Sequence, residues 1–270
     1  MHDVSVRTGT GMAEPSSATY GSGIYRFTPV LITGVLVTIV LILAVILYGL
    51  LGGVINPPAP RTYPEYLLVR AQTMVGEEPG NGQYWADYVD IMILRGNYRE
   101  AEDLIVQARE AVGDSATILL VNNAELRLLL AQGVYEEVLE RGEAYLEQDA
   151  EMLKSQLADY AARGITVPST FNKQRAAVTI ETLLVRARAA VELKEYETAL
   201  DDLNAALDWD PLAADIRIFR GNVGLLEGGA ESLERAKEDF TFALQFLPDS
   251  DAARAGLAEL ERRLEEEVAP

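Results

Sequence analysis

Carboxylates are the commonest side chains in this chain that could carry chemistry. The 270 residues include 42 Asp and Glu but only one histidine and no cysteine. Paired carboxylates can share general acid and base work, yet so many on amphipathic helices are mostly solvated faces. His2 lies in the N-terminal tail, and without cysteine there are no thiolates or disulfides, so no histidine or thiolate site can form in the folded part. We therefore expect no enzyme: no catalytic residues, no metal and no cofactor.

The negative charge of the chain is confined to its larger, C-terminal part. The four charges before Arg61, those of Asp3, Arg7, Glu14 and Arg26, cancel one another, so the residues from Arg61 onward carry the whole net charge of −19. Phosphate binding needs clustered Lys and Arg, so nucleic acid is not an expected partner. We interpret the acidity as a solvated outer face that keeps this part soluble.

A long apolar segment precedes the acidic part. No Asp, Glu, Lys, Arg or His occurs between Arg26 and Arg61, and Val30–Leu51 is apolar except for two threonines, one tyrosine and two glycines. A helix over this segment would be about 33 Å long, which matches a hydrocarbon core of about 30 Å. We expect one uncleaved transmembrane helix within residues 28–53, because the apolar run is longer than the core of a signal peptide.

The segments on either side of this span give its expected topology. Residues 1–27 are rich in Gly, Ser and Thr, which predicts a disordered tail, and residues 54–63 form a proline-rich linker. The basic residues on the two sides nearly balance. Because Arg26 adjoins the span directly, we favour a cytoplasmic tail and an extracytoplasmic domain in a single-pass integral membrane protein. Gly49 and Gly53, four residues apart, permit either homo-dimerisation of the span or a flexible exit from the bilayer.

One spacing of side chains recurs in the acidic part. Successive steps of three, four and three residues mark one face of a helix, and small residues in that pattern allow two helices to approach closely. A turn signal separates each such helix from another apolar helix before it, which predicts helical hairpins. The copies are Tyr98, Ala101, Ile105, Ala108; Tyr196, Ala199, Leu203, Ala206; Leu233, Ala236, Phe240, Ala243; and, more weakly, Tyr135, Val138, Gly142, Tyr145.

This pattern resembles the tetratricopeptide repeat (TPR) family over about residues 80–250. Trp85 fits the aromatic residue that opens a repeat, and Asp210-Pro211 fits its end. The resemblance implies an all-α fold: a TPR-like solenoid of helical hairpins without strands, which here follows the single transmembrane helix. We expect a helical domain over residues 64–270, with repeats at about 80–113, 115–148, 180–211 and 212–248.

The repeat is interrupted near its middle. Tyr135 and Tyr196 lie 61 residues apart, about 27 more than one repeat of 34 residues. We predict two unusually long helices there, inserted at about residues 147–180 and joined by a loop at Gly164–Pro168. They could bind a partner, mediate dimerisation or be a tolerated insertion. Residues 64–75 and a C-terminal helix over 251–267 should cap the ends of the solenoid.

Solenoids of this kind offer a concave groove lined by the first helix of every hairpin. Asparagine or arginine in the groove could bind the backbone or the terminal carboxylate of an extended peptide, although the arginines could equally pair with neighbouring Glu. The chaperone-tail binders of the family use lysines and asparagines, and acidic residues here do not favour such a clamp. The candidate groove residues are Asp90, Asn123, Arg127, Glu181, Arg188 and Asn222.

These features together predict a function without catalysis. We expect a membrane-anchored scaffold or assembly factor that binds a protein or peptide partner through the groove. A first alternative is a permanent structural subunit of a membrane or envelope complex. A second, by analogy of layout alone, is a chaperone-like factor for translocated proteins or apocytochromes.

Overall fold

The computed structural model describes residues 39–40, 42–43, 62–167 and 169–268. The chain divides into two units, Met1–Pro60 and Arg61–Pro270. The expected tail, and all of the expected span and linker except a few positions, lie outside the described residues. Within the described ranges, no helix is both long and apolar enough to cross a membrane.

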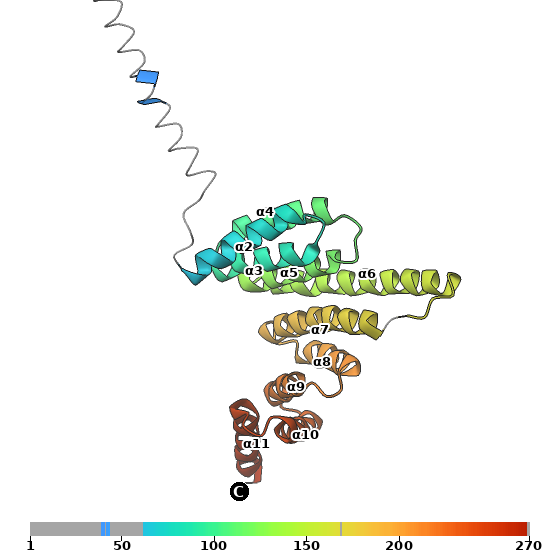
Figure 1. Ribbon diagram of the computed structural model, residues 1–270. Coiled ribbons are helices and arrows are strands. Elements are labelled where there is room, and N and C mark those ends of the chain that lie inside the picture. The colour runs from blue at the N-terminus through green and yellow to red at the C-terminus, as the bar shows by residue number, and fades with distance from the viewer. Residues whose placement is uncertain (1–38, 41, 44–61, 168, 269–270) are drawn as a thin grey trace, which may run out of the picture. The chain divides into compact units, whose positions relative to one another are not determined.

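Residues 62–167 and 169–268 form ten helices and no strand (Figure 1). The all-helical expectation is therefore confirmed for this part of the chain. The helices are α2 (Tyr63–Glu77), α3 (Gly82–Leu94), α4 (Tyr98–Val112), α5 (Ile118–Gln132), α6 (Tyr135–Ala162), α7 (Ser169–Glu192), α8 (Tyr196–Trp209), α9 (Ala214–Glu227), α10 (Ala230–Phe246) and α11 (Asp251–Val268).

The helices pack as successive antiparallel hairpins. Each helix from α2 to α11 contacts the next one along the chain, and the first helices of neighbouring hairpins also lie side by side, α3 against α5 and α5 against α7. Helix α2 packs on α3, and α11 packs on both α9 and α10, so these two helices cover the ends. The architecture is that of a TPR-like solenoid, as the repeat spacing predicts.

Small residues allow the hairpins to close. Ala101, Ala108, Ala199 and Ala206 are fully buried, because no larger side chain fits where two helices meet. The large residue between the alanines of the last copy, Phe240, is also fully buried. Glycines make room for its ring: a Cβ on Gly221 of α9 would lie 2.8 Å from the ring, and one on Gly256 of α11 would lie 2.4 Å away.

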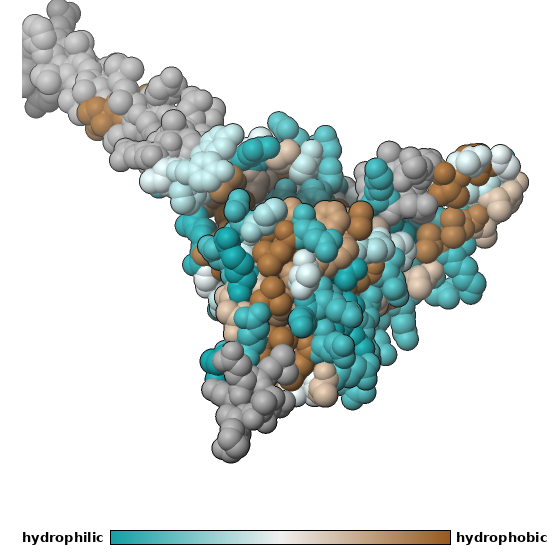
Figure 2. Space-filling view, turned by 90° about the horizontal axis from the view of Figure 1, so that it is seen from below, coloured by the Kyte–Doolittle hydropathy of each residue, from teal (hydrophilic) through white to brown (hydrophobic). Residues whose placement is uncertain are grey.

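The inserted residues lengthen two existing helices. Helix α6 has 28 residues and α7 has 24, so the extra sequence continues the second helix of one hairpin and the first helix of the next. A buried ion pair between Asp149 of α6 and Arg175 of α7 joins them. Their far ends project beyond the neighbouring helices (Figure 1), and Figure 2 shows exposed apolar side chains on this arm, which includes Leu157 and Ile165.

Gly142 explains why the second copy of the repeat is weak. A Cβ on this glycine of α6 would lie 2.6 Å from both Cγ and Cδ of Arg186 on α7. The stem of Arg186 therefore fills the place that a large side chain takes in the other copies. Its guanidinium Nε then lies 3.4 Å from Oδ2 of Asp202 on α8, so this one arginine links three helices.

Candidate functional site

A groove of two neighbouring cavities runs across α3, α5 and α7. The larger has a volume of about 570 Å³ and the smaller about 260 Å³. Gln83, Leu120 and Glu181, one residue from each of the three helices, line both cavities. We call this feature the α3/α5/α7 groove. It lies where first helices of successive hairpins pack side by side, the surface on which the sequence places the candidate residues.

The larger cavity is mainly apolar. Its walls carry the aliphatic side chains of Leu119 and Leu120 from α5 and of Ala177 and Val178 from α7. Its size lies within the usual range for ligand pockets in proteins. The remaining lining residues are Gln83, Ala116, Thr117, Gln156, Arg175 and Glu181.

The smaller cavity is dominated by three charged side chains. Arg127 of α5 donates to both carboxylate oxygens of Asp90 on α3, from Nε and Nη2, at 2.8 Å each. Its Nη1 donates to Oε1 of Glu181 on α7. We call these three residues the Arg127 cluster. Two carboxylates thus share one guanidinium, which leaves an excess negative charge at this end of the groove.

The Arg127 cluster is partly open to solvent. The side chain of Arg127 is 23% exposed, and those of Asp90 and Glu181 are each 39% exposed. Burial raises the pKa of Asp90 and outweighs the opposing hydrogen bonds from Arg127. Burial would lower the pKa of Arg127, but its hydrogen bonds to Asp90 and the two carboxylate charges raise it. The guanidinium therefore stays charged, and the carboxylates keep surface on which a ligand could bind.

Asn123 is buried beneath the groove and hydrogen-bonds to Glu181. Its side-chain Nδ2 donates to the carbonyl oxygen of Val178 at 3.0 Å and to Oε2 of Glu181 at 3.4 Å. Its Oδ1 accepts a hydrogen bond of 2.6 Å from the hydroxyl of Thr182. Asn123 is only 1% exposed, so it connects α5 to α7 and cannot itself contact a ligand.

The structure brings four of the six candidate groove residues together. Asp90, Arg127 and Glu181 line the smaller cavity, and Asn123 supports them. Arg188 is exposed on α7, seven residues or two helical turns beyond Glu181 on the same face. Asn222 is exposed on α9, a helix that packs against α8, α10 and α11. Neither joins the Arg127 cluster within the described residues.

Sequence reasoning missed most residues of the apolar cavity. The signal that could have found them is the seven-residue spacing along one helix face. Gln83 lies seven residues before Asp90, and Leu120 lies seven residues before Arg127. If the predicted polar face is extended by two turns toward the N-terminus of each helix, it includes both Gln83 and Leu120.

A second charged group lies on the other side of α5. Glu125, whose side chain is 9% exposed, accepts hydrogen bonds from Arg109 of α4 and from Arg141 and Tyr145 of α6. Burial, followed by the hydrogen bond to Glu125, raises the pKa of Tyr145 to about 12. These contacts join three helices, and we assign them a structural role.

The described residues contain no group of three or more His, Cys, Asp and Glu arranged to hold a metal ion. The charged groups of the groove are carboxylates and arginines that pair with one another. What this arrangement can do is present apolar surface beside partly exposed negative charge.

Comparison with known proteins identifies no family. No family model and no curated protein matches the sequence. Among solved structures, "MamA RS-1 ArsTM double mutant" is 15% identical with a TM-score of 0.45, and the match covers 70% of this chain and 88% of the other. "Crystal structure of YrrB: a TPR protein with an unusual peptide-binding site" is 14% identical with a TM-score of 0.27, and the match covers 70% of this chain and 97% of the other. "Crystal structure of APC/C hetero-tetramer Cut9-Hcn1" is 12% identical with a TM-score of 0.28, and the match covers 77% of this chain and 50% of the other. All three TM-scores lie below 0.5, so these likenesses carry no argument about function.

Proposed function

We propose that this protein is a non-catalytic scaffold that binds a partner protein through the α3/α5/α7 groove. The observation that carries the proposal is the convergence of Asp90, Arg127 and Glu181 beside an apolar cavity of about 570 Å³. The three residues come from three first helices of successive hairpins, the surface that a TPR-like solenoid offers to a partner.

The construction of the groove supports binding over catalysis. Its floor is preformed: Asn123 donates to Glu181 and accepts from Thr182, and α5 packs against both α3 and α7. A preformed surface loses little entropy when a partner binds. Exposed carboxylate surface then gives specificity, while the aliphatic wall gives burial of apolar area.

A membrane tether is the second part of the proposal. It rests on the uncharged apolar segment Val30–Leu51 and on the linker that follows it. The tail would lie in the cytoplasm, and the helical domain would hold its partner on the extracytoplasmic side. The tether would restrict the search for a partner to the membrane surface, where it raises the effective concentration of the groove.

Site-specific photo-crosslinking in intact cells tests the binding surface. A photoreactive amino acid replaces Gln83, which is exposed and lines both cavities, and in a matched control it replaces Val106, exposed on α4 outside the groove. We expect a discrete adduct from position 83 that is absent from position 106. The same adducts from both positions, or none from position 83, would contradict groove binding.

A further inference from the structure

The apolar part of the groove sets one requirement for a ligand. Its walls are the aliphatic side chains of Leu119, Leu120 and Val178 with the small Ala177. Filling such a cavity with a large apolar side chain removes that side chain and the walls from water, which is favourable by about 25 cal/mol per Å². A segment that occupies the groove therefore needs a Leu, Ile, Met or Phe at this point.

The charged end sets a second requirement. Asp90 and Glu181 share the single positive charge of Arg127, and Asp87 stands one turn from Asp90 on α3, where its charge adds to the raised pKa of Asp90. Two carboxylates thus share one guanidinium, and the charge of Asp87 acts on one of them. A cationic side chain would gain from this excess, whereas an anionic one would be repelled.

The arginines of the groove are already engaged. Nε, Nη1 and Nη2 of Arg127 each donate to a carboxylate oxygen. Arg175, whose side chain is 7% exposed, pairs with Asp149 through Nη2, while its buried Nε has no hydrogen-bond partner among the described residues. A terminal carboxylate could form a bidentate pair with Arg127 only by displacing a carboxylate of the protein itself, so the charged end of the groove is a poor site for an acidic tail.

From these contacts we infer that the groove recognises an extended segment in which a large apolar side chain lies a few residues from a lysine or arginine. The apolar side chain occupies the larger cavity, and the cation contacts the exposed surface of Asp90 and Glu181 at the smaller one. This inference rests on the proposed function, because it specifies the partner of the same groove. The net charge of −19 on the chain strengthens the preference by attracting cationic segments from a distance.

Selection from a random peptide library displayed on phage tests this preference on the full chain in mild detergent. We expect the selected peptides to combine an apolar residue with Lys or Arg. A synthetic peptide of the selected sequence should bind about tenfold more weakly when its cation is replaced by Gln. Glu181→Gln in the protein should weaken binding to a similar extent. The matched control, Asp103→Asn on the exposed face of α4, also removes one carboxylate but lies outside the groove and should leave affinity unchanged.

The outcomes separate the two levels of the proposal. The first outcome is selection of acidic or uncharged peptides whose affinity falls when Leu120→Trp fills the cavity but not in Glu181→Gln. This outcome would overturn the cation preference and leave the groove as a binding site. Selection of no peptide whose binding depends on Leu120 or Glu181 would overturn both.

Discussion

Arg127 of α5 donates two parallel hydrogen bonds to Asp90 of α3, Nε to Oδ1 and Nη2 to Oδ2, each 2.8 Å long. This bidentate geometry fixes orientation as well as distance. Because the two residues lie on first helices of adjacent hairpins, the contact sets how these helices align along the groove. The same guanidinium also reaches Glu181, so one side chain aligns three helices at the site of the proposed interaction.

Replacing Arg127 should therefore weaken the fold as well as the site. Arg127→Met leaves two partly buried carboxylates facing each other without a cation, and we expect a loss of about 1–2 kcal/mol in the free energy of unfolding, after allowance for solvent screening. Urea unfolding followed by circular dichroism measures this. Arg188→Met, at an exposed position of α7, should change stability by less than about 0.5 kcal/mol. Equal effects of the two substitutions would show that the Arg127 cluster does not hold the helices together.

Asp202 should make stability depend on pH. Its side chain is 9% exposed, and burial raises its pKa to about 6 from an ordinary value of 3.8. Between these pH values the folded state binds more protons than the unfolded state, so this contribution to stability is largest below pH 3.8 and falls as pH rises toward about 6.

Asp202→Asn should remove that dependence, because the amide mimics the protonated acid. We expect the variant to be more stable than the parent at pH 7 by about 2 kcal/mol, with a flatter stability curve between pH 4 and pH 7. Thermal unfolding at a series of pH values would measure both curves. Parallel curves would mean that Arg186 fully compensates the buried charge.

Gly142 should tolerate no side chain while Arg186 occupies its place. In Gly142→Ala the new Cβ would meet Cγ and Cδ of Arg186 at 2.6 Å, and displacement of this partly buried side chain should cost about 1–3 kcal/mol. The control is Gly76→Ala on α2, where nothing lies within 4 Å of the added Cβ. Chemical unfolding of both variants, and of Gly142→Ala combined with Arg186→Ala, should show that truncating Arg186 makes the alanine at position 142 less costly. Additive effects would disprove the steric link.

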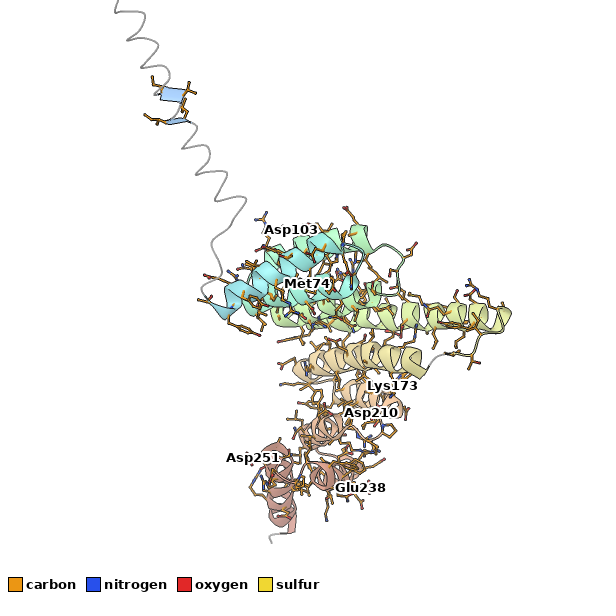
Figure 3. The ribbon with its side chains drawn as sticks, in the orientation of Figure 1. Met74, Asp103, Lys173, Asp210, Glu238 and Asp251 are labelled. Atoms are coloured by element: carbon orange, nitrogen blue, oxygen red, sulfur yellow. The ribbon has the colours of Figure 1, made fainter. Side chains whose placement is uncertain are left out.

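The orientation of the helical domain can be measured directly because the chain contains no cysteine. Glu238→Cys places one thiol on the exposed surface of α10 (Figure 3). We expect a membrane-impermeant maleimide to label it in intact cells, which is the result for an extracytoplasmic domain. Labelling only after lysis would place the domain in the cytoplasm, and the parent chain provides the background.

Deleting residues 1–53 should release the protein from membranes. The prediction follows from the apolar segment Val30–Leu51 and from the strongly charged surface of the remaining chain. Fractionation of cell extracts measures the distribution of the two forms. A truncated form that stays with the membrane after a high-salt wash would contradict the tether, and the salt wash separates integral from electrostatic association.

Much of the fold could be predicted because the repeat shows itself as a local periodicity of side chains. The alanines at three- and four-residue spacing had to face inward, and Ala101, Ala108, Ala199 and Ala206 are indeed fully buried. The break at Gly164 was likewise predictable, because its positive φ of 64° suits glycine at the end of a long helix. Such features depend only on residues within one or two turns of each other.

The candidate site could be predicted only in part. Helical spacing placed Asp90, Arg127 and Glu181 on the first helices that line the expected groove, but it could not pair them, because Arg127 lies 37 residues from Asp90 and 54 from Glu181. Helical spacing also could not show that Asn123 is buried and forms only internal hydrogen bonds. Nor could it show that Arg188 and Asn222 lie outside the Arg127 cluster.

The sequence by itself determined which face of each helix is apolar, where the helices end, and where a long uncharged segment precedes them. Those properties follow from side-chain volume, charge and the 3.6-residue turn, all of which act locally. Only the tertiary structure decided which charges meet and where a cavity opens. These depend on the rotation and offset between neighbouring hairpins, which contacts between residues far apart in the sequence determine.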